Sequence, residues 1–268
     1  MASGPSRLSA AFEARPAGSP PGLIPYITAG FPRRESTAAL LHAAQRAGCL
    51  AVEVGIPFSD PLADGPTIQR SSQRALHNGM SAGLALEQVA LSRGAGLALP
   101  VAAMTYINPV LAYGIERFCA DAAKAGLDGL IVPDLPDGEA DELRAHAGKA
   151  GLALVPLVAP TTTPDRLQRA CEHAQGFIYC VSVTGTTGAR ARIAPEAFGL
   201  LDRVGKTTKL PRALGFGLSR HEHLLSLRGH CEAAVVGAAL IEAVDAAHDN
   251  APAVVERFCA SMLHGDAT

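Results

Sequence analysis

The sequence predicts an α/β protein, a single (β/α)8 TIM barrel with an extra N-terminal helix and a split helix after the second strand. Apolar runs alternate with amphipathic helical runs along the chain, and no linker or change of composition divides its 268 residues. Most apolar runs lack polar and apolar alternation, which is typical of strands covered on both faces. We therefore expect one domain over 1–268, with disordered ends at 1–5 and 265–268.

Short apolar runs and glycines set the expected element boundaries. The candidate strands are 23–28, 51–55, 99–106, 129–133, 152–158, 177–182, 212–216 and 233–237. Helical runs between them often end in glycine, a common helix stop. Gly79 interrupts the run 65–92 and predicts two helices there. A doubly wound open sheet is the alternative, but the turn after the first strand reads TAGFP and lacks GxGxxG.

Composition excludes several classes of function. With 48% hydrophobic and 18% charged residues, the chain can bury a sizeable core. Its net charge of -2 provides no basic stripe for nucleic acid. No apolar run is long enough to cross a membrane, and the start lacks the apolar core of a signal peptide. We expect a cytoplasmic protein that binds neither nucleic acid nor membrane.

Cysteine and histidine spacing predicts no metal site. The six cysteines are scattered, without a CxxC pair, and are expected to be reduced and packed as small hydrophobes. His221 and His223 lie two residues apart on an expected helix, so their side chains point apart. We interpret both histidines as surface residues.

The stretch VEVGIPFSDPLADGPT, residues 52–67, places carboxylates at the expected mouth of the barrel. Catalytic groups of a barrel come from the carboxyl ends of strands and the loops that follow. Glu53 lies within the second strand, where desolvation would raise its pKa and suit it to proton transfer. Asp64 lies on a proline-stiffened loop and could accept a substrate N–H. The alternatives are a structural Glu53 paired with an arginine and an Asp64 that caps a helix; Asp60 is a site residue or a turn former.

Two glycine-containing turns predict a phosphate site. They are 215–219 after the seventh strand and 236–239 after the eighth, the loops that often bind phosphate in barrels. The alternative is that these glycines only end strands and start helices. The glycine-rich loop 182–194 is a candidate lid, and Asp134 and Tyr179 are further candidates at the mouth.

The positions of lysine and histidine restrict the chemistry. None of the four lysines falls at the carboxyl end of an expected strand, so a Schiff-base aldolase has no nucleophile. No histidine falls there either, which argues against a zinc aldolase. Cleavage of a carbon–carbon bond would therefore depend on carboxylates.

The segment 53–69 closely resembles the signature of the tryptophan synthase alpha chain family. Further segments resemble the family in the right order between about 23 and 240, among them TAGFP, MTYINPVLAYG, GLIVPDLP, FIYCVSVTGTTG and AAVVGAAL. The resemblance implies a (β/α)8 barrel that cleaves indole-3-glycerol phosphate to indole and glyceraldehyde 3-phosphate. It implies that Glu53 protonates the indole ring at C3 and takes up the glycerol hydroxyl proton, and that Asp64 accepts the indole N–H.

The same resemblance implies the remaining site residues. The substrate would contact Tyr179, Tyr106, Ile68, Phe216 and Thr187. The backbone N–H groups that hold phosphate would come from Gly188, Gly217, Gly237 and Ala238. Family members often have serine where this chain has Ala238, so we expect a lost hydroxyl contact and weaker phosphate binding.

The resemblance also implies a partner, the tryptophan synthase beta chain, in an alpha2-beta2 heterotetramer. Pyridoxal phosphate would belong to the partner, and no cofactor is expected in this chain. The expected interface residues are Pro57, Asp60, Asn108, Pro109, Asp134 and Pro136. The alternatives are a free-standing indole-3-glycerol phosphate lyase, a non-catalytic phosphate-binding regulator of the beta chain, and another phosphate-binding barrel such as an isomerase.

Overall fold

The computed structural model describes residues 7–16, 18–181, 193–215, 217–247 and 250–265. The ends 1–5 and 266–268 and most of the candidate lid, 182–192, lie outside the described residues. Within them, every strand pairing is parallel.

The strands form a barrel that the chain itself closes. In the described residues they are β1 (Gly22–Thr28), β2 (Val52–Gly55), β3 (Val101–Met104), β4 (Gly129–Ile131), β5 (Ala153–Val155), β6 (Leu157–Val158), β7 (Ile178–Val181), β8 (Arg212–Gly215) and β9 (Ala233–Val236). Their order in the sheet is β5-β4-β3-β2-β1-β9-β8-β7-β6. The two strands at its ends, β5 and β6, are consecutive in the chain, with only Pro156 between them. The predicted barrel is confirmed.

Pro156 explains the one extra strand. The prediction of a continuous strand over 152–158 is wrong, because proline has no N–H to donate to a sheet. β5 pairs with β4, and β6 pairs with β7. The carbonyl of Pro156 still accepts the N–H of Tyr179 at 3.0 Å, which carries the sheet across the break.

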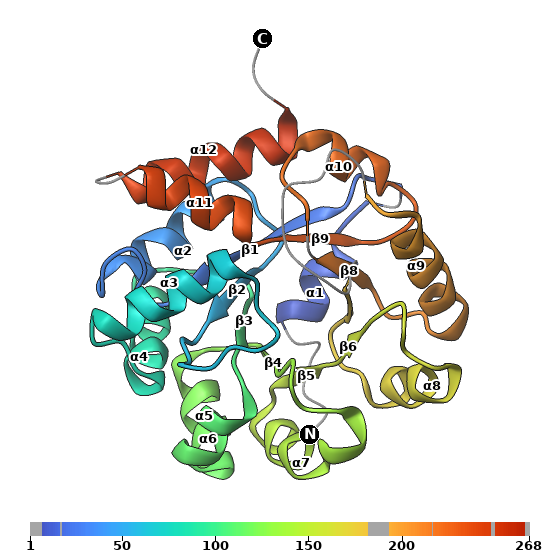
Figure 1. Cartoon of the computed structure of the whole chain (residues 1–268), viewed down its shortest axis with the longest axis horizontal. Coiled ribbons are helices and arrows are strands. Elements are labelled where there is room, and N and C mark those ends of the chain that lie inside the picture. Colours follow the sequence, from blue (N-terminus) through green and yellow to red (C-terminus); the bar gives the residue numbers. More distant parts are fainter. Residues whose placement is uncertain (1–6, 17, 182–192, 216, 248–249, 266–268) are drawn as a thin grey trace.

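Helices surround the barrel (Figure 1). They are α1 (Arg7–Glu13), α2 (Ser36–Arg46), α3 (Pro66–His77), α4 (Ala82–Gly94), α5 (Ile107–Tyr113), α6 (Ile115–Ala125), η1 (Asp137–Glu139), α7 (Asp141–Ala150), α8 (Pro164–His173), α9 (Pro195–Thr207), α10 (His221–Ser226), α11 (Ala238–Ala246) and α12 (Ala251–His264). The predicted N-terminal helix is α1. The predicted split at Gly79, whose φ is +82°, separates α3 from α4.

Helix α5 was not predicted, and the strand predicted over 99–106 is longer than the observed β3. The strand ends at Met104 and the helix begins at Ile107. The Asp134 carboxylate, which follows β4, accepts the N–H of Ile107 at 2.9 Å. The first N–H of this helix therefore finds its hydrogen-bond acceptor in a residue distant in sequence, and local sequence patterns do not reveal such a contact.

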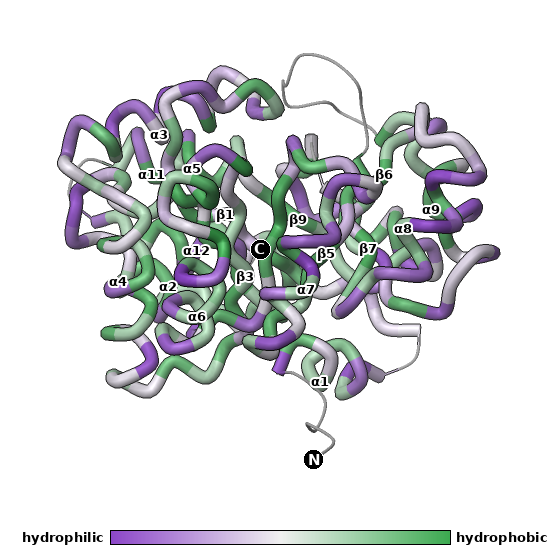
Figure 2. The backbone as a smooth tube through the Cα atoms, turned by 90° about the horizontal axis from the view of Figure 1, so that it is seen from below, coloured by the Kyte–Doolittle hydropathy of each residue, from purple (hydrophilic) through white to green (hydrophobic). Residues whose placement is uncertain are grey.

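Helix α1 closes the barrel at the end opposite helices α3 and α5 (Figure 2). Leu8 is fully buried, and the ring of Phe12 lies 5.5 Å from that of Phe177. Arg7 donates to Asp128 at 2.7 Å. Side chains of α1 therefore fill this end of the barrel, and the carboxyl ends of the strands lie at the other end.

The buried carboxylate of Asp128 links several segments at this closed end of the barrel. Its carboxylate is 5% exposed and accepts hydrogen bonds from Arg7, from Arg93 at 2.8 Å and from the N–H of Val101 at 2.8 Å. Arg93 is itself 14% exposed, so losing its partner would leave a largely buried cation.

Replacing Asp128 with alanine should lower the free energy of unfolding by roughly 2–4 kcal/mol, which corresponds to a fall in Tm of about 5–10 °C. Thermal unfolding followed by circular dichroism measures this. The matched control is Glu256→Ala, which removes the exposed Arg46–Glu256 pair and should cost under about 1 kcal/mol. Equal losses in the two variants would contradict the role of Asp128.

Candidate active site

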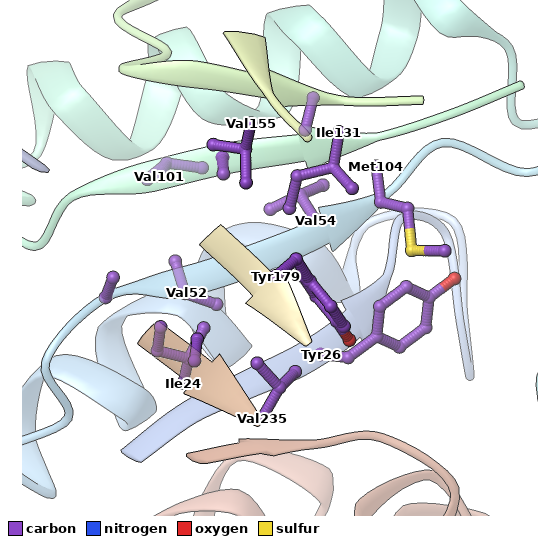
Figure 3. Packing of buried hydrophobic residues seen from close by; sticks show 14 of the residues in the cluster. Ile24, Tyr26, Val52, Val54, Val101, Met104, Ile131, Val155, Tyr179 and Val235 are labelled. Carbon is purple, nitrogen blue, oxygen red and sulfur yellow. The ribbon is translucent and has the colours of Figure 1, made fainter. Parts of the chain in front are cut away.

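A cavity opens at the carboxyl ends of the strands, and the roughly 780 Å³ of space in and above it includes open solvent. It is lined by Tyr26, Glu53, Asp64, Gly65, Thr67, Ile68, Met104, Tyr179, Gly217, Leu218, Ser219, Val235, Gly237, Ala238, Ala239 and Glu242. The sheet register explains part of this gathering, because Tyr26, Glu53 and Ala102 lie side by side on neighbouring strands. Figure 3 shows Tyr26 and Tyr179 next to each other in the barrel interior.

Glu53 is a buried acid without a partner. Its side chain is 1% exposed, and neither carboxylate oxygen has a hydrogen-bond partner among the described residues. Burial, with a smaller contribution from the charge of Asp64, raises the pKa of Glu53 to about 8. The alternative of a structural ion pair with arginine is therefore not realised in the described chain. At neutral pH this carboxyl group holds a proton that it can transfer.

Asp64 faces the same cavity from the loop after β2. The backbone around it is fixed, since its N–H donates to Pro61 at 3.0 Å and its carbonyl accepts from Gln69 at 2.9 Å. The N-cap of α3 is Gly65, so Asp64 does not cap the helix. Burial raises the pKa of Asp64 to about 6, and a hydrogen bond from the Tyr106 hydroxyl partly opposes the rise.

The two carboxyl groups therefore differ in protonation near pH 7. Glu53 is mainly protonated and Asp64 mainly ionised. Two carboxyl groups whose surroundings separate their pKa values can act as a proton donor and a fixed negative charge in one site. The roles that the sequence predicted for Glu53 and Asp64 in the reaction stay predictions.

Tyr106 lies behind Asp64 and is not among the residues that line the cavity. Its hydroxyl accepts the N–H of Ala63 at 3.0 Å and donates to Asp64. The structure thus places this predicted substrate contact where it supports the carboxylate. Ile68 and Tyr179 do line the cavity, whereas Phe216, Thr187 and Gly188 lie outside the described residues.

Glycines leave room for the two tyrosines in the cavity. A Cβ at Gly55 would lie 1.9 Å from the hydroxyl oxygen of Tyr26, and a Cβ at Gly215 would lie 2.4 Å from that of Tyr179. Each ring thus lies over the end of the adjacent strand. Any larger residue at either glycine would displace a ring that shapes the cavity.

The two predicted phosphate turns follow β8 and β9, and both contribute residues to the lining of the cavity. Gly217 has a φ of +78°, a conformation that requires glycine although an added Cβ would meet nothing. Gly237 is the N-cap of α11, so the N–H groups of the first helical turn have no partner within the helix. Unpaired N–H groups at a helix start attract anions. Gly217, Gly237 and Ala238 line the same cavity as the two carboxyl groups.

Sequence reasoning missed Tyr26 and Glu242, which both line the cavity. Aligning the first two strands would have revealed Tyr26 beside Glu53. The interpretation of His223 as a surface residue is wrong, because its ring is 4% exposed. Its Nδ1 accepts the N–H of Ser219 at 3.1 Å, which holds the turn that follows β8.

The predicted interface residues differ in exposure, and none of them lines the cavity. Asp60, Asn108, Asp134 and Pro136 are exposed, Pro109 is half-buried, and Pro57 is buried. Two large apolar side chains that were not predicted are exposed nearby in sequence, Leu62 at 92% and Leu111 at 54%. Leu62 lies between Asp60 and Asp64 on the loop after β2.

Comparison with known proteins establishes the family. A family model described as the tryptophan synthase alpha chain matches residues 12–266. The chain belongs to this family. Tryptophan synthase alpha chains are also its sequence relatives: that of Chloroflexus aggregans is 48% identical over 223 residues, 83% of this chain and 84% of the relative. That of Gluconacetobacter diazotrophicus is 45% identical over 261 residues, 96% of this chain and 95% of the relative.

Solved tryptophan synthase structures share the fold. The alpha subunit from Legionella pneumophila superposes with a TM-score of 0.90 at 34% identity, covering 98% of both chains. A chain from the tryptophan synthase a2b2 complex of Pyrococcus furiosus gives a TM-score of 0.86 at 39% identity, covering 91% of this chain and 98% of that one. The resemblance inferred from residues 53–69 is thereby confirmed.

The described residues also bear on two other kinds of site, a metal centre and a membrane-spanning helix. Over the described part of the chain, no three or more histidine, cysteine, aspartate or glutamate side chains gather where they could hold a metal ion. Among the helices of the same residues, none has the length and apolar character needed to cross a bilayer.

Proposed function

We propose that this chain is the alpha subunit of a tryptophan synthase, and that its single barrel domain cleaves indole-3-glycerol phosphate to indole and D-glyceraldehyde 3-phosphate. The indole passes to a beta subunit, which uses it to make L-tryptophan. The observation that supports this activity most directly is the presence of Glu53, Asp64 and both phosphate turns in one cavity.

The reaction is a retro-aldol cleavage that runs on the two carboxyl groups. Glu53 gives its proton to C3 of the indole ring, and the ring becomes a cationic indolenine. Asp64 accepts the indole N–H and stabilises the positive charge that develops there. The bond between C3 and the glycerol carbon then breaks, its electron pair returns to the ring, and the glycerol hydroxyl proton passes to the Glu53 carboxylate. Indole and an aldehyde leave, and Glu53 is protonated again.

The protonated ring is the electron sink of this mechanism, so no lysine adduct is needed. Burial of Glu53 keeps its proton available near neutral pH, whereas Asp64, with a pKa of about 6, is mainly ionised there. The turns at Gly217 and Gly237, which line the same cavity, would supply N–H groups for the phosphate. Tyr179 and Ile68 would contact the indole ring between them.

The partner we propose is a beta chain in an alpha2-beta2 heterotetramer, which would carry the pyridoxal phosphate. The exposed Leu62 and Leu111 support an interface on the loop after β2 and on α5. They lie close in sequence to the predicted contacts Asp60, Asn108 and Pro109. We propose that this chain works in the cytoplasm and needs no cofactor of its own.

Indole formation from indole-3-glycerol phosphate, measured with and without a beta chain, tests the proposal. We expect slow release of indole by the chain alone and faster release with the beta chain. Full activity without acceleration by the beta chain would favour a free-standing lyase. No indole under either condition would favour a non-catalytic regulator.

Ala238 provides a test of the phosphate subsite. We expect Ala238→Ser to lower the KM for indole-3-glycerol phosphate by up to about tenfold, because the new hydroxyl can donate to an anionic oxygen. The gain is smaller where water already makes this contact. Ala243→Ser, on the same helix but outside the cavity lining, should leave KM unchanged. An unchanged KM in Ala238→Ser would contradict the proposed phosphate position.

A further inference from the structure

The phosphate side of the cavity contains an acidic residue that the mechanism does not use. Glu242 lies on α11, one turn beyond the N–H groups at Gly237 and Ala238, and lines the cavity with them. Among the described residues that line the cavity there is no lysine, arginine or histidine, whereas Glu53, Asp64 and Glu242 are all acids. The described part of the subsite therefore offers N–H groups to an anion. It also contains one carboxylate, that of Glu242, which no positively charged side chain of the described lining neutralises.

A hydrogen bond holds this carboxylate at the cavity. The Thr67 hydroxyl, in the first turn of α3, donates to Oε1 of Glu242 at 2.9 Å. The Thr67 side chain is 9% exposed, so the contact is sheltered on the α3 side. Arg70 also donates to the Thr67 hydroxyl, at 3.3 Å, but its side chain is exposed and does not line the cavity.

We infer that Glu242 is a specificity-determining residue that limits the affinity of this site for dianionic phosphate. This inference rests on the phosphate subsite of the proposed function. The fixed carboxylate repels a phosphate held by the N–H groups of Gly237 and Ala238, and the repulsion is reduced by solvent because Glu242 is exposed. A weaker hold on phosphate favours release of the phosphorylated product. It also reduces the preference for substrates with a dianionic tail over those with a singly charged one.

The decisive variants are Glu242→Gln and Glu242→Asp. Glutamine keeps an acceptor oxygen for Thr67 and removes the charge, whereas aspartate keeps the charge and shortens the side chain. We expect Glu242→Gln to lower the Kd of inorganic phosphate and of glyceraldehyde 3-phosphate by about threefold to tenfold. Glu242→Asp should stay within about twofold of the wild type. Isothermal titration calorimetry on the full chain measures both values.

Asp245→Asn is the matched control. Asp245 lies on the same helix, pairs with Arg74 of α3 at 2.9 Å and does not line the cavity. The Asp245→Asn variant removes one negative charge, as Glu242→Gln does, and should leave the Kd of phosphate unchanged. In high salt the difference between Glu242→Gln and the wild type should shrink, because a charge effect is screened and a packing effect is not.

The inference is overturned if Glu242→Gln binds phosphate no more tightly than the wild type. It is equally overturned if Glu242→Asp or Asp245→Asn tightens binding as much, since the charge at position 242 would then not be the cause. Because the measurement is direct binding, it does not depend on turnover. Tighter phosphate binding without indole release would uphold the role of Glu242 while the proposed reaction failed.

Discussion

Replacing Glu53 with glutamine should abolish measurable indole release. Glutamine has nearly the same shape, but it cannot give a proton to C3 or accept one from the glycerol hydroxyl. General acid and base catalysis by one positioned group contributes about 10²–10⁴-fold to a rate. Because both proton transfers depend on Glu53, we expect a loss towards the upper end of this range. The measurement is kcat for indole formation with saturating substrate and beta chain.

The stability of the same variant separates lost chemistry from lost folding. Glu53 has a pKa of about 8 in the folded chain against 4.5 as its ordinary value. Below pH 4.5 the group is protonated in both states; as the pH rises towards 8, only the unfolded state loses its proton, so the folded state becomes less stable. At about 1.36 kcal/mol per pH unit, this lowers the free energy of unfolding by roughly 3 kcal/mol at pH 7.

We therefore expect Glu53→Gln to be more stable than the wild type near pH 7 and similar to it near pH 4. Thermal unfolding at the two pH values measures the difference. A variant that is inactive and also less stable at pH 7 would contradict the assignment of Glu53 as a buried, protonated acid. A variant that keeps its activity would contradict its role in proton transfer.

The barrel and both carboxyl groups could be predicted from the sequence because the signals are local. Alternation of apolar and amphipathic runs indicates parallel strands covered by helices, and a glutamate inside such a strand is conspicuous. The break at Pro156 could also have been inferred, since proline cannot donate to a sheet. The start of α5 could not, because its first N–H is satisfied by Asp134 from another loop.

The residues missed in the cavity depend on contacts between distant segments. Glu242 reaches the cavity because α11 packs beside α3, which no local pattern of its own helix reveals. His223 is buried and its ring accepts the N–H of Ser219, whereas its spacing from His221 predicted only a surface helix. Tyr106 was predicted to contact the substrate, but its hydroxyl donates to Asp64 and its side chain does not line the cavity.

Replacing Asp64 with asparagine should lower kcat by about 10²-fold or more, because asparagine can still accept the indole N–H but carries no charge to stabilise the cationic ring. The wild type needs an ionised Asp64 and a protonated Glu53. Its activity should therefore rise as the pH passes about 6 and fall as the pH passes about 8. Since the two groups interact, these apparent pKa values belong to the pair.

The pH profile of Asp64→Asn then gives a result that simple damage to the site cannot imitate. The acid limb near pH 6 should disappear, because the group that titrates there is gone. The alkaline limb should move below pH 8, because the charge of Asp64 helps to raise the pKa of Glu53. Asp165→Asn, an exposed change on α8, should keep both limbs. If Asp64→Asn keeps the acid limb, or its alkaline limb does not move, then the two carboxyl groups do not share one site, and the division of roles between a protonated acid and a fixed anion is wrong.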